Sequence, residues 1–436
     1  MTVPVRARVF TYGDYEVDAG ARRLTCHYRS DDVEFIEVAS FDETVDLSGT
    51  AASGVAILYH LVAGLSYYKA GAARVVDLGE WASAPNGALV ARAIRDGLGE
   101  FAYRNDLDLA DVEVGDEAAA RPISAGHVLD RGPLIPFGGG IDSIVTAADA
   151  PDDAALFVVG PAEQRFDAIE RPAVLTGLPV VRCSRRLDDK IIASRKHGWF
   201  DGHVPVTAMV SALAVVAAIS QGRNAVVMSN ERSSSSPNLV VDGREVNHQW
   251  SKSWAFEQAL RAWLAGTTDT GLAYYSALRD RSELWVAREF ASHPEYFDTF
   301  MSCNRAFRQD PAARATTWCG ECDKCLFIDL VLAPFVDRSR LELLFAGSEP
   351  LGDPRRADEL EVLAGLAANP KPFECVGDTD ECATALVATA ARADRADQGH
   401  LVGLAGRLGH ARPLEALLAP EGPTNAPERD ATRHLV

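Results

Sequence analysis

The chain is short of basic residues for its size. It carries 43 Lys and Arg against 62 Asp and Glu, so the formal net charge of the 436 residues is −19. Non-specific nucleic-acid binding requires a surplus of Lys and Arg that displaces counterions from phosphates, and this sequence does not have one. We therefore expect no nucleic-acid partner, although a local basic pocket in an acidic protein can still bind an anionic small molecule.

The sequence also has few long apolar runs. Met1–Phe10 contains no apolar stretch that could serve as a signal peptide. The segment Val204–Ser220 is strongly apolar, but it contains Thr207 and Ser211 and is too short to span a bilayer comfortably. It predicts a buried helix instead. Eight cysteines in a chain of this length, without an export signal, do not indicate a disulfide scaffold. We expect a cytoplasmic protein that does not associate with membranes.

The length predicts two or three domains. Residues 1–130 mix strand-like segments with apolar helical stretches, which is typical of an α+β domain. In residues 131–335, apolar runs of strand length alternate with helical patterns, and this predicts a parallel sheet with helices on both faces. Residues 336–420 are rich in Ala and Leu and predict a helical region, followed by a flexible tail at 421–436.

The expected elements follow from apolar periodicity and turn residues. The predicted strands are Arg6–Tyr12, Arg22–Tyr28, Val33–Phe41, Leu134–Phe137, Ala155–Val159, Pro179–Cys183 and Ala225–Met228. The predicted helices are Gly54–Tyr68, Ala88–Phe101, Ser143–Ala150, Glu163–Thr176, Val206–Gln221 and Trp254–Leu264. Since ligands of parallel sheets bind at the carboxyl ends of the strands, we expect the functional residues at that edge.

The most informative segment is Pro136–Ser143, which follows a predicted strand, opens a predicted helix and contains Gly138, Gly139 and Gly140. Three glycines without Cβ atoms allow backbone N–H groups to converge on a phosphate, and the helix N-terminus adds partial positive charge. Ser143 can donate a further hydrogen bond. Asp142 is expected to hold a divalent cation or to orient the loop. A tight strand-to-helix turn is the simpler alternative.

This segment is similar to the S-G-G-x-D-S loop of the PP-loop ATP pyrophosphatases, except that Gly138 stands where that pattern has its first Ser. The resemblance implies cleavage of ATP to AMP and pyrophosphate with adenylation of a substrate oxygen, and a Mg²⁺ ion. The segment fits neither G-x-x-x-x-G-K-[ST] nor G-x-G-x-x-G, so γ-phosphate transfer with a loop lysine and dinucleotide binding are not indicated.

Four cysteines follow the spacing C-x15-C-x2-C-x2-C: Cys303, Cys319, Cys322 and Cys325. A C-x2-C pair places two thiolates on one turn, and four sulfurs without a nearby His favour structural Zn²⁺. An iron–sulfur cluster or free thiols are the alternatives. The pattern resembles the zinc site of the cyanodeazaguanine-synthase branch of the PP-loop enzymes. Of the remaining cysteines, Cys183 is interpreted as a core residue or an acid/base thiol, and the others as buried or surface thiols: Cys26, Cys375 and Cys382.

Residues 201–257 carry many polar side chains near predicted strand ends. A solvated loop with capping serines is the alternative to a catalytic region here. Several segments of the chain resemble the UDP-N-acetylmuramoyl-L-alanyl-L-glutamate epimerase family: Leu65–Lys69, His203–Thr207, Met228–Ser233, Arg244–Lys252, Trp318–Cys325 and Lys371–Gly377. The resemblance implies ATP-dependent inversion of the terminal L-Glu of UDP-MurNAc-L-Ala-L-Glu, a nucleotide-sugar dipeptide, in peptidoglycan precursor synthesis.

Candidate roles follow from side-chain chemistry. We expect His248 and Glu231 to transfer protons, with His203, Lys252 and Cys183 in reserve, since the ordinary pKa of His lies near neutrality. Residues expected to bind the acidic substrate are Lys69, Asn230, Arg232, Arg244 and Asn247. Each of these histidines could instead be a structural hydrogen-bonding group, and each cation could be part of a surface salt bridge.

Two other functions stay open at this stage. Another carboxylate-adenylating PP-loop enzyme would form an amide, amidine or nitrile from the same acyl-adenylate. A zinc-stabilised nucleic-acid-binding module is disfavoured by the charge of −19. The sequence does not indicate an oligomeric state.

Overall fold

The computed structural model describes residues 4–115, 122–124, 129–162, 164–308 and 311–423. In this part of the chain, ten strands form one sheet in the order β12-β9-β6-β7-β8-β3-β2-β1-β4-β5. Their bounds are β1 Val9–Asp18, β2 Arg23–Ser30, β3 Val33–Phe41, β4 Val75–Asp77, β5 Glu113–Val114, β6 Leu134–Pro136, β7 Ala155–Pro161, β8 Val180–Arg186, β9 Ala225–Met228 and β12 Ala273–Ser276. A separate hairpin pairs β10 Leu239–Val241 with β11 Arg244–Val246.

The sheet is parallel in one half and antiparallel near its middle. Strands β12, β9, β6, β7 and β8 pair in parallel, which confirms the predicted mostly parallel α/β arrangement. Strands β3, β2 and β1 continue the same sheet in antiparallel pairing, through β3 against β8. The sheet therefore crosses the domain boundary predicted at residue 130. The division into domains stays a prediction.

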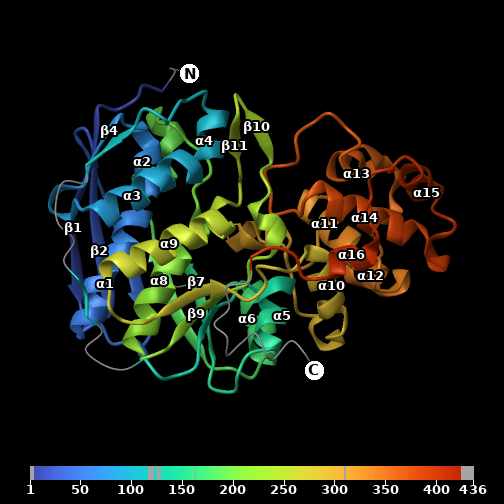
Figure 1. The fold of residues 1–436 in the computed structure, drawn as a ribbon, viewed down its shortest axis with the longest axis horizontal. Coiled ribbons are helices and arrows are strands. Elements are labelled where there is room, and N and C mark those ends of the chain that lie inside the picture. Colours follow the sequence, from blue (N-terminus) through green and yellow to red (C-terminus); the bar gives the residue numbers. More distant parts are fainter. Residues whose placement is uncertain (1–3, 116–121, 125–128, 163, 309–310, 424–436) are drawn as a thin grey trace.

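Two hydrophobic cores lie on opposite faces of the sheet, because successive side chains of a strand point to opposite sides. In β6, Leu134 belongs to one core and Ile135 to the other; in β7, Phe157 and Leu156 alternate in the same way. Helices pack on both faces of the parallel strands, as predicted, whereas β1, β2 and β3 alternate between buried residues of the first core and more exposed residues (Figure 1). The first core includes residues of α1 Thr50–Ala63, α2 Leu65–Gly71, α3 Ala84–Arg92, α4 Gly99–Arg104, α8 Val206–Ser220 and α9 Trp254–Thr267.

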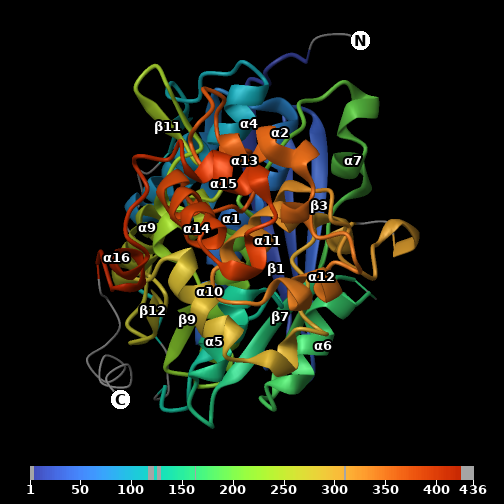
Figure 2. The same ribbon diagram turned by 90° about the vertical axis from the view of Figure 1, so that its right-hand side faces the viewer.

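The second core joins the parallel strands to the C-terminal helices. It includes residues of α5 Ile141–Ala148, α6 Asp167–Leu175, α10 Glu283–Ala291, α11 Asp323–Leu332, α12 Arg338–Leu344, α13 Ala357–Leu363, α14 Thr379–Ala390, α15 Gly399–Ala405 and α16 Leu414–Leu418. Helices α13, α14 and α15 lie together at one side of the molecule, at the right in Figure 1 and facing the viewer in Figure 2. The helical character predicted for residues 336–420 is confirmed. Most of the predicted tail, residues 424–436, lies outside the described part.

Two apolar helical stretches are packed inside the molecule. Helix α8 is the buried helix predicted from Val204–Ser220. The stretch Thr50–Gly71 is the one candidate membrane span among the described residues by length and composition, but 83% of its most apolar window is buried against the rest of the protein. The core helix of a globular protein meets the same criteria, so this stretch is weak evidence for a membrane span.

Candidate active site

The glycine loop connects β6 to α5, as predicted. Gly139 has a φ of +75°, and a Cβ at this position would lie 2.2 Å from the backbone oxygen of Ala168. Only glycine fits there without moving backbone. A Cβ added at Gly138 would have no atom within 4 Å. Gly140 is the N-cap of α5. The Ser143 hydroxyl donates to the Gly140 carbonyl oxygen at 3.0 Å, so it contributes to the turn itself.

Three carboxylates meet at the carboxyl edge of the parallel strands. Asp142 follows β6, Glu231 follows β9 and Glu283 follows β12, and these three strands are neighbours in the sheet. One oxygen from each lies within 4.8 Å of the other two. Glu231 is 1% exposed, yet neither of its carboxylate oxygens has a hydrogen-bond partner, and Asp142 Oδ1 is also buried without one. The sequence predicted that Asp142 and Glu231 lie at this edge of the sheet. It did not predict that their side chains lie close to each other.

Burial and mutual repulsion determine the charge of this cluster. The pKa of Asp142 is raised to about 7, first by burial and then by the negative charge of Glu231, while Lys252 and Lys324 act in the opposite direction. The pKa of Glu283 is raised well above its usual range by burial and by Asp142. Buried carboxylate oxygens without partners fit a hard divalent cation, which is bound by carboxylate oxygens. A bound cation would reverse these shifts.

A second polar cluster joins distant parts of the chain. Glu100 of α4 accepts from His248 Nδ1 at 2.5 Å, and the rings of His248 and His203 lie 4.1 Å apart between centroids. Burial alone would lower the pKa of His248, but hydrogen bonds to Cys375 and Glu100 raise it to about 9. Burial and the neighbouring charge of His248 lower the pKa of His203 to about 4. His248 is therefore a cation near pH 7 and His203 is neutral.

Lys252 and Cys375 continue this cluster toward the carboxylates. Lys252 Nζ lies 3.7 Å from Cys375 Sγ. Burial would raise the pKa of Cys375, but Lys252 and a hydrogen bond from His248 lower it to about 6. Burial would lower the pKa of Lys252, but the negative charges of Cys375, Glu231 and Asp142 raise it. The predicted residues His203, His248 and Lys252 thus lie together around the thiol of Cys375, which was predicted only as a buried or surface thiol.

The other expected substrate-binding residues have partners within the protein. Arg232 Nη1 lies 2.6 Å from Glu421 and Arg232 Nη2 lies 3.8 Å from the buried Glu381. Arg244, on β11, lies 2.9 Å from Asp108 at the surface.

Lys69 Nζ donates to Asp201 at 3.0 Å. The Asn247 side chain donates to the Ser234 carbonyl oxygen and accepts from the Gln249 backbone N–H, and the Asn230 backbone N–H donates to Ser276 Oγ at 2.7 Å. Cys183 is buried where β8 pairs with β3, and burial raises its pKa.

All four clustered cysteines come together next to α11. Sulfur atoms of Cys303, Cys319, Cys322 and Cys325 lie within 4.8 Å of one another. The Sγ atoms of Cys319 and Cys322 lie 3.6 and 3.5 Å from that of Cys325. Tetrahedral zinc with Zn–S bonds of about 2.3 Å requires sulfurs roughly 3.8 Å apart. The arrangement fits a four-sulfur metal site, Cys303 included.

Comparison with known proteins identifies the family. A family model described as the MurL N-terminal domain matches residues 1–277, and one described as the MurL C-terminal domain matches residues 299–415. A protein of Xanthomonas oryzae pv. oryzae (strain MAFF 311018), named UDP-N-acetyl-alpha-D-muramoyl-L-alanyl-L-glutamate epimerase, is 40% identical over 354 residues, covering 80% of this chain and 77% of its own. The chain belongs to the MurL epimerase family.

Two further relatives carry the same name. The Salinispora tropica (strain ATCC BAA-916 / DSM 44818 / JCM 13857 / NBRC 105044 / CNB-440) protein is 41% identical over 343 residues, covering 76% of this chain and 71% of its own. The Micromonospora sp. (strain ATCC 39149 / NRRL 15099 / SCC 1413) protein is 36% identical over 392 residues, covering 87% and 86%. No solved structure matches the chain. The resemblance to the MurL family inferred from the sequence is confirmed.

Three residues of this candidate site were not predicted from the sequence of this MurL family member. Glu283 follows β12, a four-residue strand that was not predicted. Glu100 lies within a predicted apolar helix, and Cys375 lies in an irregular segment between α13 and α14. A search for carboxylates after every short apolar run could have found Glu283. No local pattern links Glu100 or Cys375 to His248, because the fold alone brings them together.

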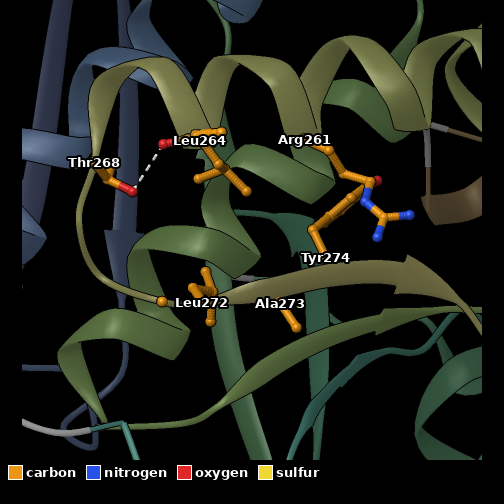
Figure 3. Close-up of a pocket in the computed structure, with 8 residues that line it drawn as sticks. Arg261, Leu264, Thr268, Leu272, Ala273 and Tyr274 are labelled. Carbon is orange, nitrogen blue, oxygen red and sulfur yellow. Dashed lines mark hydrogen bonds between the residues drawn. The ribbon is translucent and has the colours of Figure 1, made fainter. Parts of the chain in front are cut away.

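A surface hollow of about 300 Å³ lies elsewhere, between α9 and β12 (Figure 3). Leu264, Leu272 and Tyr274 line it, and Thr268 Oγ1 donates to the Leu264 carbonyl oxygen at 3.0 Å. Arg261 is the charged side chain in its lining. Because it offers no carboxylate, imidazole or thiol, we do not assign the chemistry of the MurL family to this hollow.

Proposed function

We propose that the protein is an ATP-dependent epimerase that inverts the terminal L-Glu of UDP-MurNAc-L-Ala-L-Glu to D-Glu through an acyl-adenylate, with release of AMP and pyrophosphate. The names of the three relatives support the epimerisation and its substrate. The observation that carries the ATP step is the glycine loop at the N-terminus of α5, with Asp142 beside two more buried carboxylates.

Adenylation explains why an epimerase would consume ATP. Removing the Cα proton from a free carboxylate places a second negative charge beside the first, which is costly away from water. Attack of a carboxylate oxygen on the α-phosphorus of ATP would form a mixed anhydride with AMP and release pyrophosphate, which removes the charge of the carboxylate and makes the Cα proton more acidic. Hydrogen-bond donors can then stabilise the resulting enolate. Hydrolysis of the inverted acyl-adenylate yields the D-Glu product.

We propose that Asp142, Glu231 and Glu283 hold Mg²⁺. The ion would neutralise phosphate charge when ATP is bound. The role of this chain's own residues is to supply carboxylate oxygens from three adjacent strand ends, and to hold Lys252 and Lys324 nearby. Glu231, expected from the sequence to transfer protons, is assigned here to the cation instead. The backbone of Gly138, Gly139 and Gly140, with Ser143 behind it, would bind the phosphates.

Three further assignments belong to this proposal. The Cys303, Cys319, Cys322 and Cys325 site holds structural Zn²⁺, since four thiolates close the tetrahedron. Lys69, Arg232 and Arg244 contribute to binding of the acidic substrate after exchanging their present carboxylate partners. The protein works in the cytoplasm, where cysteines that form no disulfide would stay reduced.

The test measures two products of one reaction in heavy water. With ATP and UDP-MurNAc-L-Ala-L-Glu, we expect deuterium at Cα of glutamate together with AMP. Asp142→Asn should reduce AMP release by about 100-fold or more, because the cation loses a ligand charge. Asp149→Asn, at the exposed far end of α5, is the matched control and should behave as wild type. AMP release without Cα exchange would favour an amide-, amidine- or nitrile-forming enzyme.

A further inference from the structure

Cys375 lies between two cationic side chains in an otherwise irregular segment. Lys252 Nζ lies 3.7 Å from its sulfur, and His248 hydrogen-bonds to the same sulfur. On the other side, Lys324 Nζ donates to the Cys375 backbone oxygen, which fixes the segment against the start of α11. These contacts come from two separate parts of the chain, one with His248 and Lys252 and one with Lys324. They surround the thiol with positive charge, the environment in which a cysteine becomes a thiolate.

The same space contains the proposed cation ligands. The negative charge of Cys375 acts on Asp142, and the charge of Asp142 acts on Lys252. The thiol therefore lies on the side of the molecule where the glycine loop ends. In an acyl-adenylate, Cα is separated from the phosphorus only by the carbonyl carbon and one oxygen. A group beside the phosphate site is consequently near the Cα–H bond.

The histidines are less suited to remove a proton. His248 Nδ1 is held by Glu100 at 2.5 Å, and this pairing keeps the imidazole protonated near pH 7. An imidazolium has no lone pair to accept another proton. His203 is neutral but lies against the His248 ring, at 4.1 Å between centroids. Lys252 is an ammonium for the same electrostatic reason that Cys375 is a thiolate.

We propose that Cys375 is the base that removes the Cα proton of the activated glutamate, held in position by Lys252 and by the His248–Glu100 pair. This assignment rests on the proposed function. The Cα–H bond breaks, its electron pair enters the enolate of the acyl-adenylate, and its proton forms the S–H bond of Cys375. A solvent-derived proton then adds to the opposite face of Cα. The Cys375 thiol returns its proton to solvent, so protons balance over one turnover.

The experiment separates proton transfer from nucleotide cleavage. In heavy water, the Cys375→Ala variant should lose Cα deuterium exchange by about 100-fold to 10,000-fold, the range for a positioned acid or base. It should still release AMP, because adenylate formation and hydrolysis do not need the thiol. The control is Cys382→Ala, which removes a fully buried thiol from α14 and should retain both reactions. Unchanged exchange in Cys375→Ala, or equal loss of AMP release and exchange, would overturn the assignment.

A second measurement uses the wild-type protein and so does not depend on folding of the variant. Iodoacetamide at pH 7, with the modified residues mapped by mass spectrometry, should alkylate Cys375 and abolish exchange while AMP release continues. A covalent glutamyl adduct on Cys375 during turnover would show a nucleophile and reject the role of a base. If the wild-type protein exchanges Cα–H without ATP, the ATP proposal fails, but the same exchange assay still tests Cys375.

Discussion

Glu100 shows how a single residue can set the protonation state of a site from a distant part of the sequence. Its carboxylate accepts from His248 Nδ1 at 2.5 Å, and it is 5% exposed. The charge and hydrogen bond of His248 lower the pKa of Glu100 despite its burial. The pair therefore stays ionised over the physiological pH range. Its positive half in turn stabilises the Cys375 thiolate.

The interactions of Glu100, His248 and Cys375 predict how the rate of Cα exchange depends on pH. Cys375 faces Lys252, Lys324 and His248, and the Asp142 carboxylate also lies in its field. The value of kcat/KM for exchange should rise as Cys375 ionises near pH 6 and fall as His248 loses its proton near pH 9. Glu100→Gln removes the negative partner of His248, so the alkaline limb should move to lower pH. The measurement is kcat/KM for deuterium exchange from pH 5 to pH 10.

The control for this prediction is Glu113→Gln, which changes an exposed carboxylate on β5 and should leave both limbs in place. An alkaline limb that does not move in Glu100→Gln would show that His248 is not responsible for it. A profile for AMP release that shifts together with exchange would instead assign the effect to the nucleotide step.

At the residue scale, the sequence predicted which residues are reactive better than it predicted which residues contact them. His203, His248 and Lys252 were selected as reactive groups, and the structure places all three in one cluster. Their thiol partner was not selected, because Lys252 and Cys375 are 123 positions apart. An ordinary cysteine pKa becomes unusual only through neighbours that the fold supplies.

At the scale of elements, the strand-to-helix turn at the glycine loop makes a test of backbone geometry. Gly139→Ala would place a Cβ 2.2 Å from the Ala168 backbone oxygen, at a φ of +75°. Strain of this kind costs about 1–3 kcal/mol before any clash is counted. We expect a lower melting temperature and loss of ATP cleavage.

Gly138→Ala is the matched control for Gly139→Ala, since no atom lies within 4 Å of the added Cβ. Its melting temperature, followed by circular dichroism, should equal that of the wild type. If both variants melt at the wild-type temperature, the left-handed turn at Gly139 is not required.

Strands with runs of Val, Ile or Leu were predicted well, even where they are short, and a strand without such a run was not. Strand β9 has the predicted bounds, and β6, β7 and β8 differ by a few residues at their ends. The apolar residues of β6, β7 and β9 are buried at successive positions, so these strands differ from the helical pattern. Strand β12 reads Ala-Tyr-Tyr-Ser and contains no run of Val, Ile or Leu, so it carries no comparable signal. Missing β12 also hid the role of Glu283, which depends on the position of that strand in the sheet.

At the scale of the whole molecule, the pairing of β3 with β8 joins two regions that the composition separated. Antiparallel and parallel segments have different hydrophobic patterns, so the sequence suggested two domains. The pairing of one strand with another through backbone hydrogen bonds leaves no pattern in the sequence. The sheet therefore continues across the predicted domain boundary, through β3 and β8, without a sequence signal. The first core likewise contains residues from both regions, including Leu58 of α1 and Leu213 of α8.

This continuity predicts that the two regions unfold together. Arg185 Nε of β8 donates to Glu37 of β3 at 2.5 Å, and Glu37 is fully buried. Arg185→Met would leave that carboxylate without its cation, at a cost of about 3–5 kcal/mol. Urea unfolding followed by tryptophan fluorescence and by circular dichroism should give one coincident transition, displaced to lower urea. Arg23→Met, which breaks a half-exposed pair with Asp18, should change stability by about 0–1 kcal/mol. Two separate transitions, or a shift confined to one probe, would mean that the shared sheet does not couple the regions and that each is stabilised by its own core.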